Sequence, residues 1–114
     1  MSVKSQQFET VHNLPKSDVL PGDRIIVETR NSEYHLQVLS DNLFAITGGW
    51  FGEDEPSRLS IVYCTRTDSF INTELIAGVG MQIRFSNDLS TSQVVRIRVL
   101  RTMSHQLGGS STSC

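Results

Sequence analysis

The sequence has little of what would place it in several broad protein classes. It contains two cysteines, three prolines and one tryptophan in 114 residues. Cys64 lies in an apolar strand pattern and Cys114 is the last residue, so the two form an unsuitable pair for a structural disulfide. No apolar run approaches the roughly 18 residues of a membrane-spanning helix, and the N-terminal stretch has no secretory signal pattern. We therefore expect a cytoplasmic protein with no membrane partner.

An excess of charge of one sign is also absent. The net charge is −2, from 10 basic and 12 acidic residues. Such a chain produces no long-range positive field to attract phosphate groups, so we expect no nucleic-acid partner. The hydrophobic fraction of 38% and the charged fraction of 19% are typical of a globular domain. A chain of this length can bury enough apolar surface to fold as one domain without metal ions or disulfides.

Short alternating patterns between turn residues predict an all-β protein. Residues 24–30 and 33–39 predict a hairpin, in which a two-residue loop at Asn31 and Ser32 would place Glu28 opposite His35. Serine is less favourable than glycine in the second loop position, so a slightly longer loop is the alternative. Five further strands are predicted, at residues 43–47, 59–65, 69–77, 81–86 and 93–101.

These strands predict a small antiparallel β-barrel, SH3-like or related, with a sandwich as the alternative. One segment is ambiguous, because residues 72–78 are also compatible with a single helical turn. We expect a flexible N-terminal arm at residues 1–19, with at most an edge strand at 8–11. The barrel domain would then occupy residues 20–103, followed by a disordered tail at 104–114.

Four short motifs resemble those of a known group of proteins. They are TRNSEY (29–34), TGGWF (47–51), GVGM (78–81) and STSQVV (90–95). These are similar to the TRNSxY hairpin, Gly-Gly-aromatic turn, GxGM and TSxV segments of small bacterial all-β proteins of unknown function. The resemblance covers roughly residues 20–99. It implies a compact domain with recurring turns, and it carries no activity.

Residues with catalytic or metal-binding chemistry are few and dispersed. His12, His35 and His105 show no metal-ligand spacing, and the strand neighbours of Cys64 predict a buried, inert thiol. The acidic run at 53–55 could hold calcium, but it lacks the spaced pattern of a calcium loop and is better explained as a solvated loop tip. We expect no catalytic residue, no metal and no cofactor, and an enzyme of unknown chemistry is the last alternative.

A basic stripe marks the last predicted strand, where Arg96 and Arg98 alternate with apolar residues and Arg101 follows. One interpretation is a surface that binds an anion or an acidic partner. The other is the charged outer face of a half-buried strand, neutralised by Glu28 or by the acidic run at 53–55. We favour the second interpretation because the chain as a whole is acidic.

The sharpest candidate for a binding site follows the glycine pair at 48–49. Trp50 and Phe51 are adjacent, so in an extended chain they point to opposite sides. We expect Phe51 to cap the domain interior and Trp50 to be partly exposed, whereas the alternative is that Trp50 fills the barrel mouth. Together with the hairpin end from Arg30 to Tyr34, they would form a contact surface.

The sequence therefore predicts a non-catalytic binding or assembly module. Its partner would be another protein or a second copy of itself, because self-association protects strand edges. The alternative is a small-ligand binder in which Tyr34, Tyr63 and Trp50 line the barrel mouth.

Overall fold

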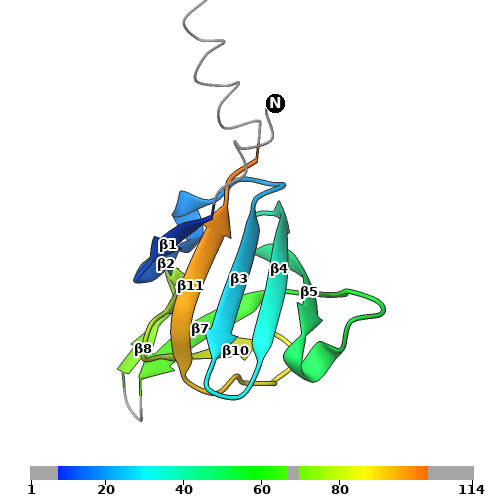
Figure 1. The fold of residues 1–114 in the computed structure, drawn as a ribbon. Coiled ribbons are helices and arrows are strands. Elements are labelled where there is room, and N and C mark those ends of the chain that lie inside the picture. Colours follow the sequence, from blue (N-terminus) through cyan, green and yellow to red (C-terminus); the bar gives the residue numbers. More distant parts are fainter. Residues whose placement is uncertain (1–7, 67–69, 103–114) are drawn as a thin grey trace, which may run out of the picture.

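A computed structural model describes residues 8–66 and 70–102. The fold is all-β, and every strand pair within it is antiparallel. In the described residues the strands do not close into a barrel; the arrangement of the sheets is compatible with a small β-sandwich or an open barrel. Figure 1 shows β7 and β10 crossing behind the sheet that contains β11, β3 and β4.

The larger sheet has six strands in the order β1-β11-β3-β4-β5-β6. In that order the strands are Glu9–Val11, Val94–Leu100, Arg24–Thr29, Glu33–Ser40, Leu43–Gly48 and Ser57–Leu59.

Two smaller sheets complete the fold, one in the order β10-β7-β8 and one made of β2 and β9. These strands are Gln82–Phe85, Ile61–Arg66, Phe70–Asn72, Asn13–Pro15 and Leu75–Gly78. Two single turns of 3-10 helix, η2 (Lys16–Asp18) and η3 (Gly49–Phe51), lie in the connections.

The period-two alternation of the sequence is what defines the core. In β3 the residues Ile25 and Val27 are buried while their neighbours are not, and β4 alternates in the same way. The alternating side chains of the large sheet meet Phe85 and Ile83 of β10 and the fully buried β9. Because all four residues of β9 are buried, alternation is absent there, which is why 72–78 was compatible with a helical turn; Leu75–Gly78 is a strand.

The first hairpin has the predicted faces but a different register. Glu28 lies opposite Glu33, not opposite His35, so the predicted pairing was wrong by two residues. The longer loop is the one adopted, because Thr29 and Ser32 close it with mutual hydrogen bonds: the Thr29 amide donates to the Ser32 carbonyl at 2.7 Å, and the Ser32 amide donates to Thr29 Oγ1 at 3.0 Å. A shift of two residues leaves each side chain on its original face. The prediction of which residues face the core was therefore still correct.

Residues 9–19 belong to the fold, which corrects the expectation of a flexible arm over 1–19. The edge strand expected at 8–11 is present as β1, paired with β11, and β2 pairs with β9. Leu14 is completely buried, and Lys16 Nζ donates to the Ile61 carbonyl at 2.8 Å. Strands of three residues are too short to show a period in the sequence, so their place is set by pairing. Residues 1–7 and the expected tail at 104–114 lie outside the described residues.

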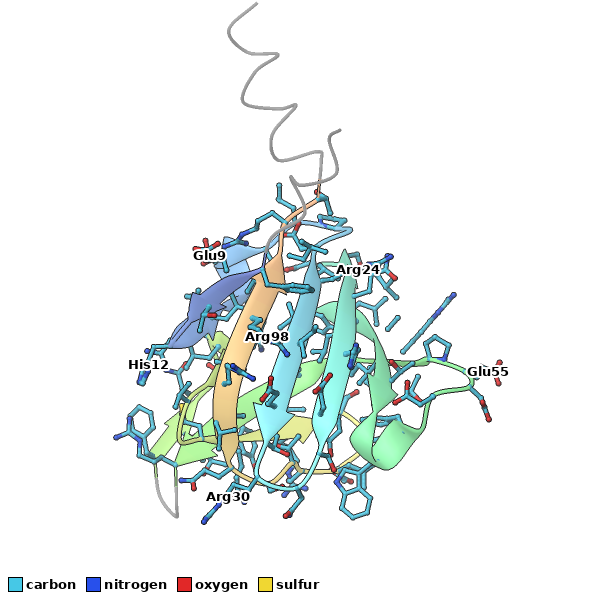
Figure 2. All side chains as sticks on the ribbon, in the orientation of Figure 1. Glu9, His12, Arg24, Arg30, Glu55 and Arg98 are labelled. Carbon is cyan, nitrogen blue, oxygen red and sulfur yellow. The ribbon has the colours of Figure 1, made fainter. Side chains whose placement is uncertain are left out.

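The basic stripe of β11 is partly compensated within the sheet. Glu28 on β3 accepts two hydrogen bonds from Arg96, both at 3.0 Å, and one from Arg98 at 2.7 Å. Figure 2 shows Arg98 on the outward face of the large sheet and Glu55 on a loop well away from it. Of the two predicted sources of neutralising charge, Glu28 is the one that contacts the stripe. Arg101 lies near other carboxylates, among them Asp18 at 3.3 Å.

The Glu28 cluster predicts a pH-dependent contribution to stability. The hydrogen bond from Arg96 is the largest effect and lowers the pKa of Glu28. Burial opposes it, and the charges of Arg96 and Arg98 lower the pKa further. A carboxylate with a depressed folded-state pKa stabilises the protein fully above its unfolded pKa, and this contribution is lost as the pH falls through the folded value. Glu28→Gln should therefore lower the free energy of unfolding by about 1 kcal/mol at pH 7.

Urea denaturation of wild type and Glu28→Gln, at pH 7 and near pH 3, checks this expectation. The difference between the proteins should shrink toward the lower pH, where Glu28 of the wild type becomes protonated. Glu55→Gln is the matched control, since Glu55 is exposed on its loop and should change stability little at either pH. An equal loss for Glu28→Gln at both pH values would show that shape, not charge, gives the cluster its effect.

Candidate functional site

The glycine pair before Trp50 allows a turn that other residues could not form. Gly48 and Gly49 have φ angles of +87° and +50°. A Cβ at Gly48 would overlap the carbonyl oxygen of Glu33, and one at Gly49 would overlap the ring of Tyr34. The turn is closed by the Gly48 amide, which donates to the Gly52 carbonyl at 2.6 Å. Close backbone approach to β4 therefore fixes where η3 begins.

Trp50 projects from this turn into solvent while its position is held. Its exposed fraction is 65%, the largest among the exposed large hydrophobic residues described. The indole Nε1–H donates to the Ser90 carbonyl at 2.9 Å, which ties η3 to a loop 40 residues away. The alternative prediction was that Trp50 fills the barrel mouth. Its exposure shows that it does not. It is an exposed ring in a defined orientation.

Phe51 points the other way and packs between the two sheets. Its ring centroid lies 5.4 Å from Phe85 and 6.1 Å from Tyr34, both in edge-to-face geometry. Tyr34 is only 2% exposed. The pKa of Tyr34 is raised, mainly by burial, and a hydrogen bond with the backbone of Trp50 partly offsets this increase. Phe51 and Tyr34, which we expected on the contact surface, therefore lie behind it. Phe51 supports Trp50 from below, and Tyr34 does so while also lining a hollow beside Trp50.

A groove runs from Trp50 across this end of the fold. It consists of two adjoining hollows of about 600 and 610 Å³, and Asn31, Gln82 and Ser92 line both. Arg30, Gly80 and Gln93 line only the first hollow. Ser32, Tyr34, Gly49, Trp50, Ser90 and Thr91 line only the second. We call this surface the Trp50 groove; each of its two hollows has a volume within the range of small-molecule sites, about 300–1,000 Å³.

The other two predicted site residues are placed differently. Arg30 lies at the groove, in the turn between β3 and β4 at the lower end of the sheet in Figure 2. Its amide donates to the Gln93 carbonyl at 3.0 Å, which holds the two walls together. Tyr63 lines neither hollow, and Arg84 covers its ring at 5.9 Å. The predicted grouping of Tyr63 with Trp50 in one pocket is therefore wrong.

The residues that the sequence reasoning missed come from two loops, at 80–82 and 90–93. Both stretches stand out in the sequence only as turn motifs, GVGM and STSQVV. In the structure the Gly80 amide donates to the Val94 carbonyl at 2.8 Å, and Gln93 Nε2 donates to the Gly80 carbonyl at 3.0 Å. No local pattern could show that these turns meet the first hairpin.

The described residues supply no metal centre and no activated nucleophile. No group of three or more potential metal-ligating His, Cys, Asp or Glu residues occurs in 8–66 and 70–102. Burial raises the pKa of the Cys64 thiol to about 12, so the nucleophilic thiolate is not formed at neutral pH. His35 lies on the outer sheet face, 2.8 Å from Glu33, and His105 lies outside the described residues.

Comparisons with known proteins give no relative. No protein-family model, no curated protein and no solved structure matches the chain significantly. The resemblance to small bacterial proteins of unknown function stays a prediction. Among the described residues, no helix has the length and apolar character needed to cross a bilayer.

The fit of Gly49 against Tyr34 predicts that the turn will not tolerate a side chain. Gly49→Ala should lower the free energy of unfolding by about 2 kcal/mol. The new Cβ would overlap the Tyr34 ring, and alanine is also strained at the positive φ of this position. Gly80→Ala is the control: its φ of +89° is also positive, but nothing lies within 4 Å of the added Cβ. Urea denaturation should show the larger loss for Gly49→Ala. Equal losses would mean that backbone strain alone requires these glycines.

Proposed function

We propose that the protein is a non-catalytic, cytoplasmic binding module that holds a ligand in the Trp50 groove. The observation that supports this most directly is the combination of a 65% exposed tryptophan, a hydrogen bond that fixes its ring, and a hollow beside it. A large ring that is already ordered loses little entropy when a ligand covers it. A solvent-exposed indole with no binding role would have no need of such restraint.

The chemistry of the groove supports binding over catalysis. Its described lining contains hydroxyl and amide side chains and one guanidinium, with no carboxylate, imidazole or thiol. General acid–base or nucleophilic catalysis requires groups that exchange protons or attack near neutral pH. The hydroxyl, amide and guanidinium groups of the lining can instead position and orient a ligand, which is what a binding module needs.

A second candidate is assembly with another copy of the chain, and β8 favours it. This strand ends its sheet, so in the described part of the chain its outer backbone edge is unpaired. Phe70 and Ile71 on it are 49% and 57% exposed. An edge strand with exposed apolar side chains is a template for pairing with a second edge. This partner surface is separate from the Trp50 groove, since neither residue lines it.

Ligand-dependent stabilisation tests the first proposal. A metabolite at about 100 times its dissociation constant should add roughly 2.7 kcal/mol to the free energy of unfolding. Thermal-shift screening of wild type should reveal such a metabolite, and Trp50→Ala should lose the shift while its melting temperature without ligand changes little, because Trp50 is mostly solvent-exposed. Gln37→Ala, on the outer face of β4, is the control. A hit that stabilises Trp50→Ala as strongly as wild type would place the binding elsewhere.

Sedimentation at increasing protein concentration tests assembly. If β8 edges pair, wild type should shift toward a dimer and Ile71→Lys should stay monomeric, since a charged side chain on an edge strand opposes pairing. Trp50→Ala should dimerise like wild type, because Trp50 is not at this edge. A monomer at all concentrations would exclude self-association, and a dimer lost in Trp50→Ala would move the interface to the groove.

A further inference from the structure

The charge of the Trp50 groove disfavours polyanionic and cationic ligands. Arg30 is the one charged side chain in the described lining, and no carboxylate accompanies it. A polyanion such as nucleic acid needs several cationic contacts, and the net charge of the chain is −2. A cationic ligand would need an acidic partner, which the lining lacks.

The groove also offers no backbone edge to an extended peptide. One side of β10 pairs with β7, with Gln82 opposite Thr65. Its other side is occupied by the 90–94 segment: the Thr91 amide donates to the Ile83 carbonyl at 2.9 Å, and the Val94 amide donates to the Met81 carbonyl at 2.8 Å. Peptides that bind by strand addition depend on unpaired main-chain groups. The groove must therefore recognise its ligand through side chains.

Those side chains are planar amides and hydroxyl groups. Asn31 and Gln82, which line both hollows, have no hydrogen-bonding partner for their amides among the described residues. Gln93 uses its Nε2 on the Gly80 carbonyl, so its orientation is fixed and its Oε1 is left as an acceptor. Each amide presents a donor and an acceptor side by side. Two neighbouring hydroxyl groups on a ring ligand match such an amide, because one hydroxyl can accept a hydrogen bond from its NH₂ group and the other can donate one to its oxygen.

Trp50 adds an apolar platform at one end of this polar surface. Its Nε1–H is used on Ser90, so what it can offer a ligand is the face of the indole ring. An aromatic face attracts the slightly positive C–H groups of a saturated ring, while amides beside it bind the hydroxyl groups at the ring's edge. A sugar presents both kinds of surface: C–H bonds on its faces and hydroxyls around its rim.

From this combination we infer that the Trp50 groove binds a neutral saccharide, one unit stacked on Trp50 and the next reaching the Asn31 and Gln82 amides. This inference rests on the proposed function and specifies its ligand. The two adjoining hollows accommodate more than one sugar unit along the groove, so the ligand is an oligosaccharide or the end of a polysaccharide.

The test uses the labelled full chain on an array of short neutral oligosaccharides, with sulfated and uronic-acid oligosaccharides and random peptides on the same slide. The wild type should bind neutral oligosaccharides, and titration with a free oligosaccharide from the array should change the fluorescence of the single tryptophan. Trp50→Ala should weaken binding about tenfold or more. Gln82→Ala should also weaken it, whereas the control Gln37→Ala, an exposed glutamine on β4, should bind as wild type.

Three outcomes overturn the inference: no neutral oligosaccharide is bound, acidic oligosaccharides alone are bound, or Trp50→Ala binds as well as wild type. Trp50-dependent binding of peptides without saccharides would also overturn it, yet leave the groove as the binding site. If no ligand of any class depends on Trp50, the saccharide inference and the proposed function both fail. Circular dichroism of each variant verifies that a loss of binding is not a loss of folding.

Discussion

The packing of Phe51 between Tyr34 and Phe85 is the contact on which the rest of this end of the molecule depends. Tyr34 comes from β4 of the large sheet and Phe85 from β10 of the small one, so the cluster joins the two layers. It also orients the 3-10 turn η3, because Phe51 packs against this cluster while the preceding Trp50 is held on the solvent side by its hydrogen bond to Ser90. Exposure of Trp50 is therefore a consequence of core packing.

Charged side chains are important on the outer face of the large sheet but nearly absent at the end of its strands, where the Trp50 groove lies. On the outer face, Glu28 binds two arginines and partly compensates a basic stripe that would otherwise resemble an anion site. At the end of the strands, charge is nearly absent, and recognition there depends on amides and an aromatic face. Composition alone showed a weakly acidic chain, and only the pairing of β3 with β11 separated these two environments.

The strands with clear alternation were predictable, and the errors follow from short or uniformly buried segments. In β3 and β4 the faces were correct while the register was wrong by two residues, since a slip of two preserves every inward side chain. Burial on both faces left β9 ambiguous between a strand and a helical turn, and the three-residue strand β2 was not predicted. The structure brings Trp50 and Arg30 to the same groove, whereas Tyr63 lies elsewhere, because its distance from Trp50 depends on how the sheets cross.

What the sequence determined by itself was the local chemistry: the strand faces, an inert Cys64, and a glycine turn directly before two adjacent aromatic residues. These depend on backbone periodicity and on the φ angles that glycine allows. The tertiary structure alone decided that the 80–82 and 90–93 loops meet the first hairpin beside Trp50. Such contacts join residues that are far apart in the chain, and they are set by the packing of two sheets, which no local pattern encodes.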